Sequence, residues 1–61
     1  MADLSEKELA ALNDSLSEES LLVKKFKLLA SQTKDCEISK EFTEISKRHQ
    51  KHYNELYSLL N

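Results

Sequence analysis

Apolar residues recur along two stretches of this chain at alternating intervals of three and four residues, the spacing that places side chains on one face of an α-helix. The first stripe, interrupted by one acidic residue, consists of Leu9, Leu12, Leu16, Glu19, Val23, Phe26 and Ala30. The second stripe, interrupted by two histidines, consists of Ile38, Phe42, Ile45, His49, His52, Leu56 and Leu59. This pattern predicts an all-α protein with helices at about residues 5–32 and 36–60.

The segment between the stripes decides between a hairpin and one long helix. Ser5 and Glu8 have the spacing of a capping box at the start of the first helix, and Asp35 is a good N-cap for a second one. A continuous coiled coil is the alternative, because no Gly or Pro marks a turn. Extending the first stripe would place these polar residues at core positions: Thr33, Glu37, Lys40 and Glu44. We therefore predict an antiparallel two-helix hairpin that forms a single domain over residues 1–61.

The ionisable residues of the two stripes meet at one level of this hairpin. The stripes are mirror images about residue 34, so Glu19 faces His49, and His52 follows three residues later on the same helix. A carboxylate and two imidazoles are suitable ligands for zinc, iron or manganese, with Glu41 and Glu55 as additional candidates. The alternative is a polar layer in which Glu19 accepts a hydrogen bond from His49 and fixes the register of the helices.

Composition and charge narrow the classes of function that the sequence predicts. The formal charge is −2, and nine Lys and Arg residues are interspersed with eleven Asp and Glu residues, so no basic surface for nucleic acid is expected. No stretch approaches a membrane span, and the acidic N-terminus is unlike a signal peptide, so synthesis in the cytoplasm is expected. The single cysteine, Cys36, cannot form an internal disulfide. Without a nucleophile and base pair or a phosphate-binding loop, we predict no enzyme, no catalytic residue and no cofactor.

The first helix is apolar on more than one face. Leu21 and Leu28, together with Ala10, lie opposite its stripe, whereas Leu22 and Leu29 widen the stripe itself. A solitary hairpin of this length buries few apolar side chains, and exposed apolar stripes usually mark an interface. We therefore predict a homodimer that forms a four-helix bundle, with Leu21 and Leu28 in the dimer interface.

The stretch from Leu12 to Leu60, above all EESLLVKKF at residues 18–26 and KRHQKHY at residues 47–53, resembles the short ferritin-like hairpins of the coat protein F-like family of endospore-forming bacteria. The resemblance implies pairing of hairpins into a four-helix bundle and a structural role in the spore coat. In ferritin-like di-metal proteins one helix supplies a Glu and the next a Glu-x-x-His. Glu19 and His49 match those positions, but Ser46 replaces the second Glu, so oxygen-activating di-iron chemistry is not expected.

Together these observations predict a small structural or interaction protein of the spore coat, with itself and other spore coat proteins as partners and no nucleic acid or membrane. The alternative is a metal-binding ferritin-like half-bundle with Glu19, His49 and His52 as ligands. A remnant metal-dependent oxidoreductase rests on fold analogy alone.

Overall fold

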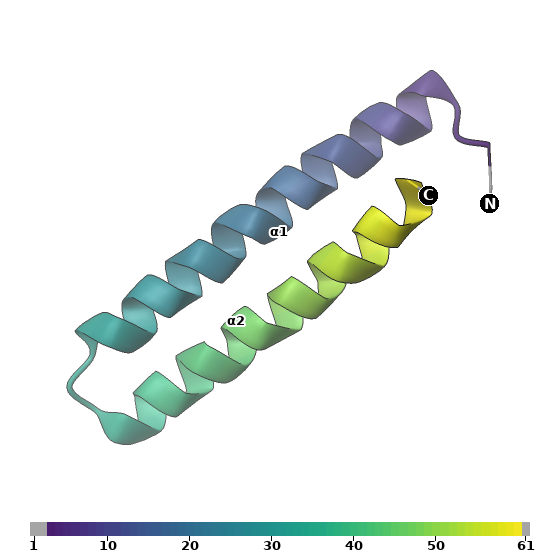
Figure 1. Ribbon diagram of the computed structural model, residues 1–61. Helices are drawn as coiled ribbons and strands as arrows, with labels where there is room; N and C mark the ends of the chain where they lie inside the picture. Colours follow the sequence, from purple (N-terminus) through teal and green to yellow (C-terminus); the bar gives the residue numbers. More distant parts are fainter. Residues whose placement is uncertain (1–2, 61) are drawn as a thin grey trace.

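The computed structural model describes residues 3–60 and consists of two antiparallel helices side by side (Figure 1). Helix α1 spans Glu6–Gln32 and helix α2 spans Cys36–Tyr57, followed by a short 3₁₀ turn, η1, at Ser58–Leu60. The predicted all-α hairpin is confirmed, and the continuous helix is wrong. The second helix ends three residues earlier than predicted, because its last turn tightens into the 3₁₀ form, as helix ends commonly do.

Both helices are capped at their N-termini by hydrogen bonds between side chains and main-chain N–H groups. The Ser5 hydroxyl accepts from the Glu8 N–H at 3.1 Å, and the Glu8 carboxylate accepts from the Ser5 N–H at 2.9 Å. At the turn, the Asp35 carboxylate accepts from the N–H groups of Glu37 and Ile38. These are the capping box and the N-cap that the sequence predicts, and both satisfy N–H groups that have no partner within a helix.

The turn between the helices needs no glycine. Thr33 ends α1 in an extended conformation, with φ −76° and ψ 143°, and Asp35 is also extended. The Asp35 N–H donates to the Thr33 hydroxyl at 3.2 Å, which holds the turn between them. Across residues 3–60, no residue has a positive φ. A chain without Gly or Pro can therefore make this reversal without backbone strain.

Two serines of α2 donate hydrogen bonds to the main chain of α1, one at the centre of the hairpin and one near the turn. Ser46 is the most buried residue of α2, with 3% of its surface exposed, and its hydroxyl donates to the Val23 carbonyl at 3.1 Å. One heptad earlier, the Ser39 hydroxyl donates to the Ala30 carbonyl at 2.8 Å. Such small side chains allow close approach of two helix backbones, so the line through Ser39 and Ser46 faces α1.

This packing corrects the predicted buried stripe of α2. Ile38 is 44% exposed and Leu59 is 50% exposed, and the side chain of His52 is also more than half exposed. At three levels the residue one position later is the more buried one: Ser39, Ser46 and Tyr53. Phe42, His49 and Leu56 keep their predicted side and are more buried than the residues that follow them. In α1 the correction is limited to Leu9, which is exposed near the open end.

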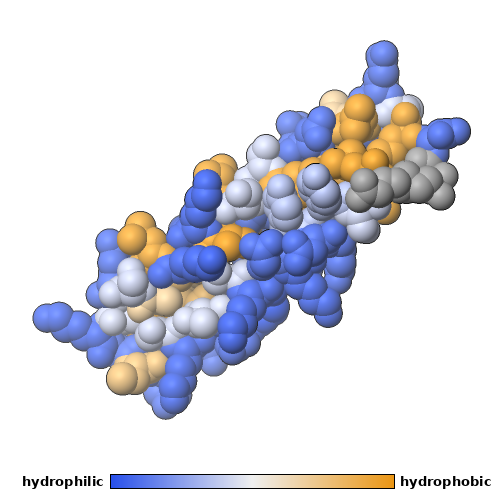
Figure 2. All heavy atoms as spheres, in the orientation of Figure 1, coloured by the Kyte–Doolittle hydropathy of each residue, from blue (hydrophilic) through white to orange (hydrophobic). Residues whose placement is uncertain are grey.

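The hairpin is a thin rod. Its Cα atoms extend 46 × 16 × 11 Å, and their radius of gyration is 14.3 Å. A compact domain of this length would have a radius of gyration of about 10.5 Å. Figure 2 shows hydrophobic side chains as separate patches between polar ones, densest toward the end where the two termini lie. Within residues 3–60, neither helix is long and apolar enough to span a membrane.

Candidate functional site

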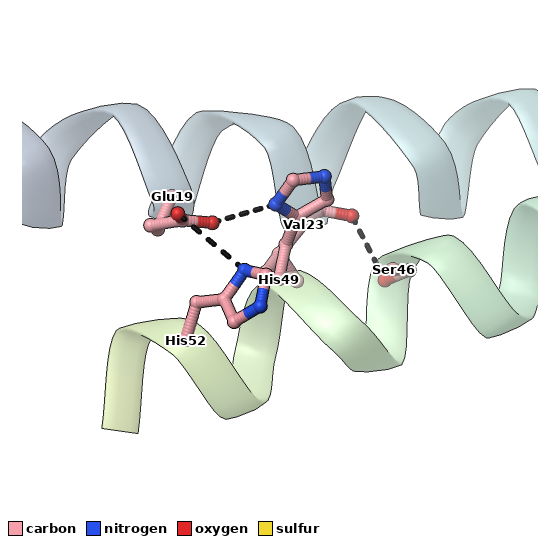
Figure 3. A network of polar contacts seen from close by, with 5 residues as sticks. All are labelled: Glu19, Val23, Ser46, His49 and His52. Atoms are coloured by element: carbon pink, nitrogen blue, oxygen red, sulfur yellow. Dashed lines mark hydrogen bonds and ion pairs between the residues drawn. The ribbon is translucent and has the colours of Figure 1, made fainter. Parts of the chain in front are cut away.

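Glu19 of α1 and the two histidines of α2 converge as the mirror pattern predicts (Figure 3). The Nδ1 atom of His49 lies 2.6 Å from Oε1 of Glu19, which is a short hydrogen bond. The Nδ1 atom of His52 lies 3.7 Å from Oε2 of the same carboxylate, within ion-pair range but too far for a hydrogen bond. One carboxylate therefore bridges two imidazoles that lie one turn apart on the facing helix.

The cluster of Glu19, His49 and His52 lies at the edge of the core, next to two phenylalanine rings. The His49 ring stacks on Phe26 with ring centroids 5.9 Å apart, and Phe26 in turn contacts Phe42 at 5.8 Å, as the mirror register predicts. The side chains of Glu19 and His49 are 20% and 22% exposed, whereas that of His52 is 52% exposed. Glu19 and His49 are therefore held by packing, whereas His52 lies at the solvent edge.

The charge partners of the Glu19 carboxylate within residues 3–60 are these two histidines. Among the described residues, its ion pairs are with His49 and His52, and none is with a Lys or Arg. A carboxylate can only accept, so Nδ1–H of His49 is the donor in the short contact. Glu19, His49 and His52 also form the one group of three in residues 3–60 whose ligand atoms are close enough for a metal ion, all within 4.8 Å of one another. Glu41 and Glu55 do not join it.

Ser46 lies one turn before His49, in the position that a second carboxylate occupies in a ferritin-like site, and it points elsewhere. Its hydroxyl donates to the Val23 carbonyl, away from Glu19 (Figure 3). Its burial was not predicted, because the apolar pattern assigned Ile45 to the seam. The sequence does contain a signal for this burial. Ser39, Phe42, Ser46 and His49 follow one another at intervals of three, four and three residues, which places the two small serines on the same helix face as Phe42 and His49.

A second feature, a groove between the helices, was not predicted. It has a volume of about 660 Å³ and is open to solvent. It is lined by Asn13, Leu16, Ser17, Ser20 and Leu21 of α1 and by Tyr53, Tyr57 and Leu60 from the end of the chain. Tyr53 and Tyr57 stack with their ring centroids 6.1 Å apart and form one wall of this groove. We call this surface the tyrosine groove.

The remaining candidates lie apart from both features. Leu21 and Leu28, the predicted dimer contacts, are 66% and 57% exposed. Cys36 is exposed at the first position of α2 as a free thiol. The Lys47–Glu44 pair at 3.7 Å lies within α2.

The fold and the site define an antiparallel two-helix hairpin with one polar layer and an open groove beside it. No protein-family model, curated protein or solved structure matches this chain.

Proposed function

We propose that this protein is a small structural component that assembles with a second copy of itself through apolar helix faces, forming a four-helix bundle. The observation that carries this proposal is the amount of surface that the hairpin exposes. Its accessible surface is 4885 Å², whereas a compact monomer of 7.1 kDa would expose about 4,100 Å². The excess, about 800 Å², is the share that one partner contributes to a protein interface of ordinary size.

The small core supports the same proposal. Among the described residues, only three apolar side chains are buried: Leu12, Leu16 and Val23. Domains of this size rarely obtain more than about 3–5 kcal/mol from a single core, and many are stabilised by association. A second hairpin packed on the first would cover apolar side chains that a monomer leaves in water.

The surface most suitable for contact with a second copy consists of the tyrosine groove and the two exposed leucines Leu21 and Leu28. Leu21 rims the groove, and Leu28 lies two turns further along the same stripe of α1. In a two-fold arrangement each surface meets its own copy, so the Leu21 and Leu28 ridge of one hairpin enters the groove of the other. The wall formed by Tyr53 and Tyr57 supplies aromatic surface with hydroxyl groups at the rim, a combination common at interfaces.

The resemblance to coat protein F-like hairpins supports a cellular location for this assembly. On that basis we place its role in the spore coat, after synthesis in the cytoplasm, with other coat proteins as further partners. The proposed role is structural and does not require catalysis. A fluorescent fusion in a sporulating bacterium tests the setting, and a diffuse signal outside the forespore surface would contradict it.

Light scattering on the tag-free protein tests the assembly. We expect a dimer at micromolar concentration and a monomer for Leu21→Gln/Leu28→Gln. Four leucines per dimer, at about 1.5 kcal/mol each, weaken association by about 10⁴-fold. The matched control is Ile38→Gln/Leu59→Gln, which replaces two exposed apolar residues that do not line the tyrosine groove. A monomeric wild type overturns the proposal, and dissociation of the control alone overturns the choice of face.

A further inference from the structure

The Glu19, His49 and His52 cluster has the composition and the geometry of an incomplete metal site. It offers one carboxylate oxygen and two imidazole nitrogens from two helices, all within 4.8 Å of one another. We propose that it binds one divalent transition-metal ion of the zinc class, with three protein ligands and an open position. This inference does not depend on assembly, because all three ligands belong to one chain.

Two features of the charge distribution favour a cation. Glu19 carries the one formal charge of the cluster when both imidazoles are neutral, and no Lys or Arg in the described chain neutralises it. Its side chain is 20% exposed, so a cation there is screened by solvent less than at an open surface. Carboxylate and neutral imidazole together match the ligands of catalytic zinc sites, which hold three protein groups and leave the fourth position to water.

The ligand atoms lie within 4.8 Å of one another, so the side chains must close around an ion. Ligand atoms at 2.0–2.1 Å from a tetrahedral ion are about 3.3 Å apart. The contact between Oε1 of Glu19 and His49 must therefore widen from 2.6 Å, and Nδ1 of His52, which lies 3.7 Å from the other carboxylate oxygen, must move toward the ion. His52 can supply most of this movement, because over half of its side chain is exposed. The stacking of His49 on Phe26 keeps the second imidazole in place.

Binding also requires a change of tautomer at His49. Its Nδ1–H now donates to the carboxylate, and a metal ion needs the Nδ1 lone pair. The proton therefore moves to Nε2 through solvent, and the ring stays neutral. The Ser46 hydroxyl takes no part, because it is engaged with the Val23 carbonyl, so the site is mononuclear and lacks a bridging carboxylate.

The site is separate from the proposed dimer surface. The residues that line the tyrosine groove include none of the three ligands. On α2, His52 and Tyr53 are adjacent in sequence, so their side chains leave the helix about 100° apart. Metal binding and assembly can therefore be measured as independent properties.

Titration of the tag-free protein with zinc, and with cobalt as a spectroscopic substitute, tests the proposal. We expect one ion per chain, a cobalt visible spectrum typical of four ligands, and a melting temperature that rises by about 10 °C or more when free zinc exceeds its Kd a hundredfold. His52→Gln should weaken binding at least 10-fold and remove the cobalt spectrum, while circular dichroism stays unchanged because the Glu19 to His49 bond remains.

Glu55→Gln is the matched control, because Glu55 lies one turn beyond His52 and could form a surface pair with it. This variant should bind zinc as the wild type does. Glu19→Gln should lose the site, and its fold is checked by its melting curve without metal. Zinc binding that survives His52→Gln, or that falls equally in Glu55→Gln, would overturn the assignment, as would a melting temperature indifferent to zinc.

Discussion

Replacement of Ser46 by leucine tests how closely the two helices approach. By the apolar pattern, a leucine at the seam should strengthen the core, by about 2 kcal/mol if it were buried without strain. The structure predicts the opposite sign. Ser46 is 3% exposed, and its hydroxyl is 3.1 Å from a main-chain oxygen of the other helix, so there is no room for a longer side chain.

The size of the effect follows from two terms. Loss of the hydrogen bond to Val23 costs about 1 kcal/mol, and overpacking at a close contact costs about 1–3 kcal/mol. We therefore expect Ser46→Leu to lower the free energy of unfolding by about 2–4 kcal/mol, most of what a hairpin of this size has. Ser46→Ala should stay within about 1 kcal/mol of the wild type, because alanine gains helix propensity as the hydrogen bond is lost.

Urea denaturation followed by far-ultraviolet circular dichroism measures these differences. All variants are compared at one protein concentration, since association adds to apparent stability. Thr43→Leu, at an exposed position on the same helix, controls for the change in hydrophobicity alone. If Ser46→Leu unfolds at the same or a higher urea concentration than the wild type, the close approach of the helices at this level is refuted.

Three further predictions concern the ends of the helices. Hydrogen bonds from the main-chain N–H and the side chain of Ser5 lower the pKa of the Glu8 carboxyl. The carboxylate therefore stabilises the fold above the pKa of Glu8 in the unfolded chain, and this stabilisation is lost as the pH falls through the lower pKa of the folded state. NMR titration of Glu8 should show the lowered pKa. Asp35→Ala should cost about 1 kcal/mol of unfolding free energy in urea melts, because two N–H groups of α2 lose their acceptor. Cys36 should react with a thiol reagent in the native protein about as fast as in urea, because it is exposed.

Each of these has its own control. Ser5→Ala removes the side-chain hydrogen bond but keeps the main-chain N–H, which is the larger cause, so the Glu8 pKa should move only part of the way toward that of the unfolded chain. An unchanged Glu8 pKa would show that the Ser5 hydroxyl does not contribute. Asp35→Asn keeps an acceptor at the N-cap and should retain most of the stability. Slow labelling of native Cys36 would mean that the turn is covered, for example by a second copy.

Much of this architecture follows from local chemistry that can be read along the chain. The three- and four-residue spacing of apolar residues defines two helices, and the Ser5 and Asp35 caps mark where each begins, because both effects act within a few residues. The mirror relation of the stripes then places Glu19 opposite His49 and Phe26 opposite Phe42, since both helices rise by the same distance per residue.

The rotation of α2 about its own axis was decided only by tertiary packing. Neighbouring positions such as Ile45 and Ser46 are both compatible with a helical stripe, and which of them faces α1 depends on the volumes of side chains on both helices where they meet. The serine lies inside because it is small and its hydroxyl finds a carbonyl on the facing helix. That choice leaves Ile38 and Leu59 exposed, places His52 at the solvent edge beside Glu19, and brings Tyr53 to the groove.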